Sequence, residues 1–258
     1  MNEAIDFSAF PPERETHLKS IYRYSMFDVM YYRSNLWQHG RRVSWIVEML
    51  EPLCVGMNID FEKARVLALV HDDAEMVTGD IQAGHKAKLN SKELNAIEDQ
   101  EEQAAHQLSQ QYPKTVHGYN YLELLVHAIH KDCIEAQLVS YADRFDAYGE
   151  TWHEMYAGNF PLIWSLLLYE RWTASFSQKY PALMPLLSQD SPWVIRNAQQ
   201  QPRKIFAADY QLLGTPHTAA SIRIPTQFPY YNVWRAMVLE NGGEEGQCFL
   251  TEQKEGLK

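Results

Sequence analysis

The sequence predicts an all-α protein, a helical bundle followed by a small, partly β C-terminal appendage. Two observations predict the bundle. Apolar residues recur with a helical period from Thr16 to about Tyr180, and Gly and Pro residues divide that stretch into helix-length segments. The composition changes after Pro185 towards loop-forming residues and short β-favouring runs, which predicts the appendage. We therefore expect an N-terminal arm (1–15), a helical domain (16–185) and a C-terminal extension (186–258).

The first two long helices are expected before Gly79. Residues 35–50 place His39 on the same face as Val43, four residues further on. Residues 61–77 form the second predicted helix, and Gly79 suits the left-handed cap that ends it. Both helices carry an apolar stripe, so we expect both to lie against a core.

Further helices are predicted over residues 90–112, over 121–155 as one helix or a broken pair, and from about 161 to 181. The helix at 90–112 begins at Asn90, a suitable N-cap, and is expected to turn Leu94, Ile97, Ala105 and Leu108 inward. In the extension, residues 222–224 and 233–240 favour extended structure, and residues 241–250 suggest a hairpin.

Charge and composition limit the partners. The net charge of -10 argues against a nucleic-acid duplex, because binding a phosphate backbone needs a basic face. The longest apolar run, residues 160–169, is too short to cross a membrane, and the N-terminal residues do not resemble a secretory signal. Three widely spaced cysteines give no disulfide framework, so we expect a reducing, cytoplasmic location.

Four polar residues in otherwise inward-facing helical stretches predict a metal site: His39, the adjacent His71 and Asp72, and Asp143. A lone histidine such as His39 is more often a hydrogen-bonded core residue. Two buried carboxylates, however, are costly unless something neutralises them. Nitrogen and oxygen donors of this kind bind a divalent cation, and Mn, Co, Ni, Fe, Zn and Mg all stay open.

The four residues also carry a resemblance to a known family. His39, His71-Asp72 and Asp143 resemble the H…HD…D signature of the HD-domain superfamily of metal-dependent phosphohydrolases. The segment HDDAEMVTGD, residues 71–80, is similar to the HD-x-x-E-x-x-T-G-D segment of bacterial 5′-deoxynucleotidases and their close relatives. The resemblance covers roughly residues 16–180. It implies an HD-domain helical bundle in which these four residues are the metal ligands.

The resemblance also implies roles for residues outside the ligand set. Glu75 matches the acidic residue that positions or deprotonates the attacking water, and Asp80 one that contacts the sugar or orients a water. Their alternatives are a solvent-exposed glutamate and a helix N-cap. Arg23 and Tyr24 stand near the position of an Arg-aromatic pair that contacts phosphate and deoxyribose, with Tyr where Trp is usual. Lys86 is a further candidate for the phosphate, or a solvated lysine.

These residues predict a metal-dependent phosphohydrolase that acts on (deoxy)ribonucleoside 5′-monophosphates through a metal-activated water. Two alternatives stay open: a (d)NTP triphosphohydrolase or pyrophosphatase of the same fold, and a non-catalytic regulatory HD protein in which residues 186–258 mediate assembly. The partner expected is a small nucleotide, and the resemblance implies a homodimer.

Overall fold

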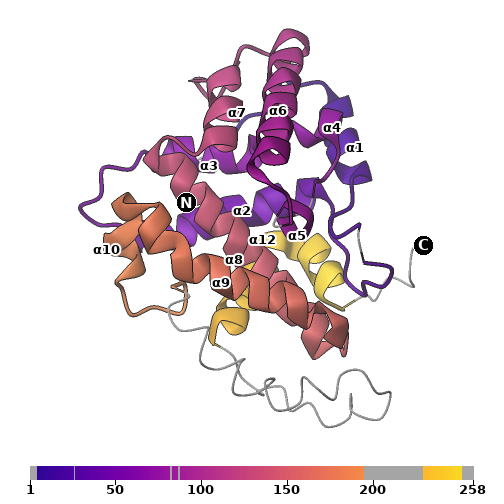
Figure 1. Ribbon diagram of the computed structural model, residues 1–258, viewed down its shortest axis with the longest axis vertical. Helices are drawn as coiled ribbons and strands as arrows, with labels where there is room; N and C mark the ends of the chain where they lie inside the picture. Colours follow the sequence, from indigo (N-terminus) through magenta and orange to yellow (C-terminus); the bar gives the residue numbers. More distant parts are fainter. Residues whose placement is uncertain (1–4, 26, 82, 87, 195–228, 252–258) are drawn as a thin grey trace. The chain divides into compact units, whose positions relative to one another are not determined.

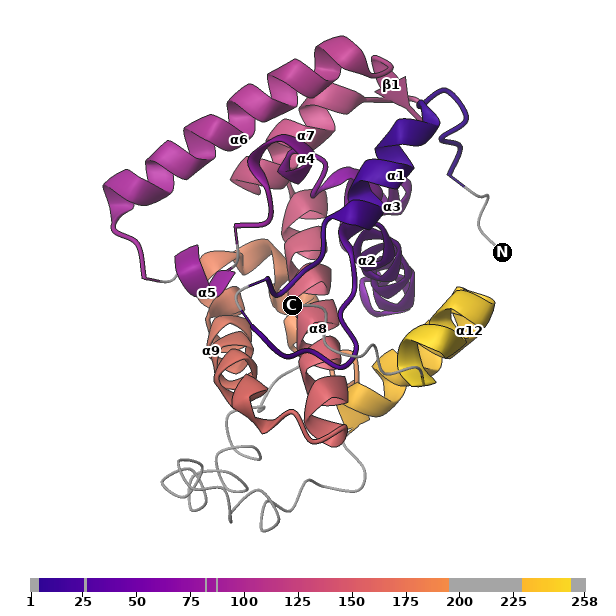
Figure 2. The same cartoon turned by 90° about the vertical axis from the view of Figure 1, so that its right-hand side faces the viewer.

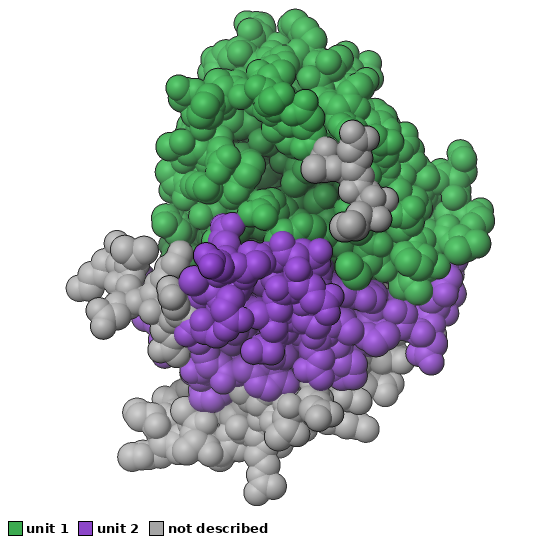
Figure 3. Space-filling view, turned by 180° about the vertical axis from the view of Figure 1, so that it is seen from behind, with its two compact units in different colours: residues 1–27, 33–143 green, residues 28–32, 144–258 purple. Residues whose placement is uncertain are grey.

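The protein is described by a computed structural model that covers residues 5–25, 27–81, 83–86, 88–194 and 229–251. The chain divides into two compact units, coloured in Figure 3. Unit 1 comprises Met1–Phe27 and Arg33–Asp143, and unit 2 comprises Asp28–Tyr32 and Arg144–Lys258. The boundaries expected from the sequence, after residues 15 and 185, stay predictions.

Unit 1 is a bundle of helices with one short hairpin (Figures 1 and 2). Its elements are α1 (Pro12–Ser20), α2 (Leu36–Leu50), η1 (Glu51–Leu53), α3 (Phe61–Val70), α4 (Glu75–Thr78), α5 (Ala83–Lys86), α6 (Ser91–Gln111), β1 (Thr115–Val116), β2 (Tyr119–Asn120), α7 (Tyr121–His130) and the first turns of α8 (Ile134–Tyr156). Helix α2 packs against α1 and α3, α3 packs against α7, and α7 packs against α6. Strands β1 and β2 pair antiparallel.

Helix α2 forms as the sequence predicts. Its N-cap residue Asn35 accepts a hydrogen bond from the Gln38 amide at 2.9 Å, and the Gln38 side chain accepts one from the Asn35 amide at 3.4 Å. This reciprocal capping satisfies amides that otherwise lack helical acceptors. Val43 and Ile46 are fully buried on the inner face, and His39 is only 1% exposed. The apolar stripe therefore carries the histidine into the core.

The predicted helix over residues 61–77 is wrong in one respect, because α3 ends at Val70. A turn follows, in which the amide of Asp73 bonds to the Val70 carbonyl and that of Glu75 to the Asp72 carbonyl. These i to i+3 bonds tighten the backbone relative to an α-helix. The turn lets Asp72 face His39 and His71 while Asp73 faces Arg14. Helix α4 then begins at Glu75. Gly79 ends α4 with a φ of 76°, the positive value expected of it, but its ψ of 163° is extended rather than left-handed helical.

Helix α6 begins at Asn90 with a capping box to Glu93, which confirms the predicted start. Its inward stripe is shorter than expected, since Leu94 is 38% exposed and Ile97 is half-buried. Only the later turns, with Ala105 and Leu108, are buried. The first turns of α6 have few apolar neighbours to bury against, so periodicity alone overestimated the buried length of the helix.

The segment predicted as one helix or a broken pair is a pair. Lys131 caps α7 in the left-handed conformation, with φ 55° and ψ 40°, and α8 starts three residues later. Unit 2 contains the rest of α8, η2 (Phe160–Leu162), α9 (Ile163–Lys179), η3 (Pro181–Leu183), α10 (Met184–Leu187) and α12 (Pro229–Thr251).

The strand and hairpin predicted within residues 233–250 are wrong, because these residues form α12. Tyr231, Trp234 and Met237 are buried at a spacing of three residues, which places them on one helical face. Gly243 interrupts the helix with a φ of 54°, a conformation that suits glycine. The Gly pair that suggested a hairpin is thus a helix break. Residues 222–224, also predicted as extended, lie outside the described residues.

The all-α fold class is confirmed. Within the described ranges the β structure consists of the β1–β2 hairpin and one isolated bridge between Tyr22 and Asn35. The same ranges hold no helix with the length and hydropathy that crossing a bilayer would require.

Candidate metal centre

Three of the four predicted ligands lie close together, one in the first turn of α2 and two in the turn after α3. Donor atoms of His39, His71 and Asp72 lie within 4.8 Å of one another. Asp72 is the centre of the group, with one oxygen 3.2 Å from Nε2 of His71 and the other 3.6 Å from Nε2 of His39. The rings of the two histidines stand edge to face with their centroids 5.3 Å apart.

Asp143 joins the group through His39. It lies on α8 at the end of unit 1, and its Oδ1 atom is 3.2 Å from Nε2 of His39. Donors around a divalent cation with bonds of about 2.1 Å are separated by about 3.0–3.4 Å in octahedral or tetrahedral geometry. The two separations of 3.2 Å fall in this range, and the 3.6 Å between Asp72 and His39 lies just above it. Asp143 meets the group through His39, while the group with all donors within 4.8 Å of one another consists of His39, His71 and Asp72.

The state of His71 gives an independent test of fit. Its Nδ1 atom is 2.7 Å from the Ala68 carbonyl, which can only accept a hydrogen bond, so Nδ1 carries the proton. The lone pair is then on Nε2. Among the described residues Nε2 of His71 has no hydrogen-bond partner although it is buried. A buried lone pair 3.2 Å from the Asp72 carboxylate fits a divalent cation.

Glu75 lies one helical turn beyond His71, and its position differs from that of an exposed helix glutamate. Its Oε2 atom is buried and has no hydrogen-bond partner within the part of the chain that the structure describes. Burial raises the pKa of Glu75 well above its usual range, and the charges of Asp72 and Asp80 raise it further. Lys86 and Arg23 lower that pKa. Glu75 thus lies within electrostatic reach of every charged candidate for substrate binding.

Arg23 and Tyr24 lie after α1 rather than on a helix. The amide of Arg23 bonds to the Ser34 carbonyl at 3.0 Å, which ties this segment to the start of α2. The Arg23 guanidinium reaches within 3.9 Å of Asp143 and lies 5.3 Å from the ring centre of Tyr24. Tyr24 is buried and has a φ of 58°, an uncommon value for a bulky residue and one that is often found at functional sites.

The other two candidates lie on the chain after α4. Asp80 is half-buried and close enough to Glu75 to raise its pKa. The ammonium of Lys86 is 2.6 Å from Oε1 of Glu101 on α6. This pairing ties the Lys86 side chain, which is 34% exposed, to α6.

A buried ion pair next to the turn that carries His71 and Asp72 was not predicted from the sequence. Arg14 and Asp73 are 2% and 1% exposed, and their side chains approach to 2.7 Å. Tyr121 donates a further hydrogen bond to Asp73 at 2.7 Å. Burial alone would lower the pKa of Arg14, but the Asp73 carboxylate outweighs that effect and raises it. Burial and the same carboxylate raise the pKa of Tyr121. The sequence did hold one indication of this ion pair, since a second aspartate, Asp73, directly follows His71-Asp72.

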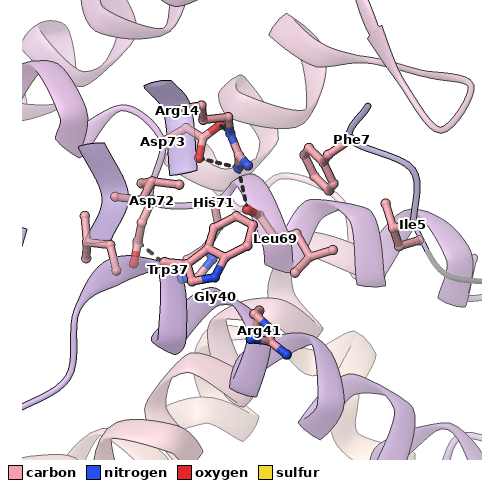
Figure 4. Close-up of a pocket in the computed structure, with 12 residues that line it drawn as sticks. Ile5, Phe7, Arg14, Trp37, Gly40, Arg41, Leu69, His71, Asp72 and Asp73 are labelled. Atoms are coloured by element: carbon pink, nitrogen blue, oxygen red, sulfur yellow. Dashed lines mark hydrogen bonds and ion pairs between the residues drawn. The ribbon is translucent and has the colours of Figure 1, made fainter. Parts of the chain in front are cut away.

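A cavity of about 190 Å³ lies beside the turn (Figure 4). Its walls are mainly apolar, and the N-terminal residues Ile5 and Phe7 contribute to them together with Trp37 of α2. His71 and Asp72 border this cavity, whereas Glu75 and the other substrate candidates are not among its lining residues. The cavity therefore reaches the metal group from a different side.

A second group of possible ligands, His127, Asp132 and Cys133, fits a cation poorly. The Nδ1 atom of His127 and a carboxylate oxygen of Asp132 are 2.6 Å apart, a hydrogen bond that already satisfies both. The ammonium of Lys63 lies 4.0 Å from the sulfur of Cys133. A positive charge at that distance opposes the binding of a cation.

The all-α fold and the cluster of His39, His71 and Asp72 agree with an HD-domain hydrolase, the class that a comparison with family models shows. A sequence model described as 5′-deoxynucleotidase YfbR-like matches residues 15–163, more than half of the chain. The chain belongs to this family and is a hydrolase of the HD type. Proteins of the HD-domain phosphohydrolase class depend on a metal, which agrees with the His and Asp donors described above.

Other comparisons add less. No curated protein matches the chain. Among solved structures, a conserved hypothetical protein from Pyrococcus furiosus is similar, with 24% sequence identity and a TM-score of 0.48. The similarity covers 62% of this chain and 92% of that protein.

Proposed function

We propose that this protein removes the phosphate from (deoxy)ribonucleoside 5′-monophosphates, with a divalent cation held by His39, His71, Asp72 and Asp143. One observation carries the proposal: neighbouring donor atoms from three separate parts of the sequence lie 3.2–3.6 Å apart, and one of them, Nε2 of His71, is buried without a described hydrogen-bond partner. Family membership supports a nucleotide substrate. The donor set is compatible with Mn, Co, Ni, Fe, Zn or Mg.

The cation would polarise a phosphoryl oxygen and lower the pKa of water. Glu75 is the proposed acceptor of the proton from the attacking water, because its buried oxygen has no other described hydrogen-bond partner. In-line attack develops negative charge on the phosphoryl oxygens. The Arg23 guanidinium, near Asp143, is the proposed group that offsets this charge.

The remaining candidates would hold the rest of the substrate. Tyr24 offers a ring beside Arg23 for the sugar, and Asp80 is proposed to accept a hydrogen bond from the sugar or from a water. Lys86 is bound to Glu101, so we propose that it adds to the local positive field and does not contact the phosphate directly.

The test is a screen for phosphate release from nucleoside mono-, di- and triphosphates with each of the six cations. We expect release of inorganic phosphate from monophosphates, and loss of most of that activity in Glu75→Gln. The matched control is Asp132→Asn, which changes a carboxylate bonded to His127 outside the metal group and should leave the rate within about twofold.

Other outcomes would replace the proposal. Release of pyrophosphate or triphosphate, with monophosphates left intact, would favour the triphosphohydrolase or pyrophosphatase reading. Stoichiometric metal binding without turnover of any nucleotide would favour a regulatory protein. Equal rates in the wild type and Glu75→Gln would exclude the proposed proton acceptor.

We also propose a homodimer in the cytoplasm. The dimer is an expectation from the family resemblance, and light scattering on the purified protein tests it. The location is supported by the three cysteines, Cys54, Cys133 and Cys248, all of which are free thiols. Fractionation of cells that express the tagged protein tests the location.

A further inference from the structure

The turn that carries His71 and Asp72 lies on a buried ion pair (Figure 4). Arg14 binds Asp73 with two parallel hydrogen bonds, from Nε at 2.8 Å and from Nη2 at 2.7 Å. The same Nη2 atom donates to the Leu69 carbonyl at 2.8 Å. One guanidinium therefore fixes both the last turn of α3 and the residue after Asp72, which leaves little freedom for the two proposed ligands between them.

The cost of burying two charges argues for a role of the ion pair beyond stability. Removing two charges from water costs several kcal/mol for each ion, and a well-packed apolar substitute is often as stable. Buried ion pairs can instead specify one arrangement of the chain. Here the arrangement is that of adjacent carboxylates: Asp73 faces Arg14, and Asp72 faces the two histidines.

Aromatic residues from two regions enclose the pair. The rings of Phe7 and Phe10 lie 4.6 and 5.3 Å from the Arg14 guanidinium. Phe10 also packs edge to face on Tyr121, with the ring centres 5.2 Å apart, and Tyr121 donates its hydroxyl to Asp73. These rings keep water from the ion pair, which strengthens its hydrogen bonds. The N-terminal residues 7–10 are thus part of this arrangement.

We propose that Arg14, Asp73 and Tyr121 form a positioning unit that holds the His71–Asp72 turn in the conformation that binds the metal. The inference rests on the proposed metal site. The three residues touch neither the cation nor the substrate in this account, and they act through the backbone of the turn. Outer residues that orient metal ligands typically change metal affinity or activity by about 10–100-fold when substituted.

Metal affinity of the purified full-length protein tests the proposal without reference to catalysis. Mn²⁺ is titrated against a competing chelator, and the absorption spectrum of the Co²⁺-loaded protein reports the coordination geometry. Asp73→Asn should weaken Mn²⁺ binding by about 10–100-fold and change the Co²⁺ spectrum. Tyr121→Phe removes a single hydroxyl, folds without a new cavity, and should weaken binding by about tenfold.

Two control variants distinguish a specific effect on the His71–Asp72 turn from a general loss of stability. Tyr119→Phe removes the same chemical group from a hydrogen bond to Asp60, at 2.9 Å, away from the turn. Arg65→Lys alters a second buried arginine, which lies on α3 and pairs with Glu48 of α2 at 3.1 Å. Both controls should keep the wild-type affinity within about twofold. Arg14→Lys keeps the charge but loses the paired geometry, so its affinity should lie between those of the wild type and Arg14→Met.

Unfolding by urea of the metal-free variants completes the test. If Asp73→Asn and Tyr121→Phe lower the stability while their metal affinity and Co²⁺ spectrum match those of the wild type, the unit is only structural and the proposal is wrong. It is also wrong if the two controls weaken binding as much as Tyr121→Phe does. A wild-type protein that binds no cation would remove the proposed site itself, a result distinct from either of these.

Discussion

Buried carboxylates occur in both units, and they are satisfied in different ways. In unit 2, Glu154 on α8 accepts hydrogen bonds from the amides of Tyr31 and Tyr32 and from the Asn159 side chain. In unit 1, Glu75 keeps a buried oxygen for which the described residues offer no hydrogen bond. Both groups are glutamate carboxylates, but only that of Glu154 has hydrogen-bond donors from the described part of the protein for both of its oxygens.

The two carboxylates differ in whether hydrogen bonds from the described residues satisfy them. Buried polar atoms in folded proteins are nearly always hydrogen-bonded, so an exception calls for an explanation. Glu154 has three donors and joins the Asp28–Tyr32 segment to α8 within unit 2. Glu75 and Nε2 of His71 are exceptions close to the same turn, where a cation and its water would supply what is missing. Asp73 in unit 1 resembles Glu154, since Arg14 and Tyr121 satisfy it fully.

The largest effect should come from Asp72→Ala. Asp72 is a proposed metal ligand that lies beside both histidines, so its loss should lower phosphate release by about 10³-fold, equivalent to about 4 kcal/mol. The free energy of unfolding of the metal-free protein should change by less than about 1 kcal/mol, because Asp72 repels Glu75 in that state. Phosphate release and urea unfolding measure the two quantities. Undiminished activity in Asp72→Ala would show that the proposed metal-site carboxylates do not differ in function from the structural carboxylate of Glu154.

Glu154→Leu should give the opposite pattern. It leaves two backbone amides and the Asn159 side chain without their acceptor, at about 1–3 kcal/mol for each buried donor. We expect the free energy of unfolding to fall by about 3 kcal/mol or more. The affinity of the folded protein for Mn²⁺ should stay within about twofold. A loss of metal affinity with little loss of stability would show that Glu154 is not the structural residue we describe.

Gly149→Ala should have a smaller effect, confined to the packing of unit 2. A Cβ atom at this position of α8 would collide with the indole of Trp234 on α12, and that indole is fully buried. Its Nε1 atom donates to Asp146 at 2.7 Å, so the ring cannot turn away freely. Overpacking of this kind costs about 1–3 kcal/mol. Urea unfolding measures the loss.

The ligand residues could be predicted from the sequence because they depend on local patterns. His39 follows from the phase of an amphipathic helix, and the segment from His71 to Asp80 from its similarity to a family motif. The structure brings His39, His71, Asp72 and Asp143 together, while their roles stay predictions. Arg14 could not be assigned in this way. It lies 59 residues before Asp73, and only the folded chain brings them together.

The C-terminal prediction failed for a different reason. Residues 233–240 favoured extended structure, and Gly242-Gly243 before residues 247–250 favoured a hairpin, since such residues are common in strands and turns. Tyr231 and Trp234 carry the helical spacing that competes with this pattern, and their burial in unit 2 decides the outcome. Tertiary packing overrides weak local preferences.

The smallest effect concerns pH and again tests the satisfied carboxylate. Burial raises the pKa of Glu154 above 4.5, although its hydrogen bonds to Asn159, Tyr31 and Tyr32 act in the opposite direction. The folded state therefore holds this proton more tightly than the unfolded state does. Consequently, the contribution of Glu154 to stability decreases as the pH rises from about 4.5 through its folded pKa.

Glu154→Gln removes this titration while it keeps one acceptor oxygen. The difference in the free energy of unfolding between the wild type and Glu154→Gln should therefore shift in favour of the variant as the pH rises from 4 to 7, a change that urea unfolding at several pH values measures. Carboxylates remote from Glu154 titrate equally in both proteins and cancel in the difference. A shift in favour of the wild type would mean that the three hydrogen bonds outweigh burial, and that the Glu154 carboxylate is stabilised more strongly by the folded chain than by water.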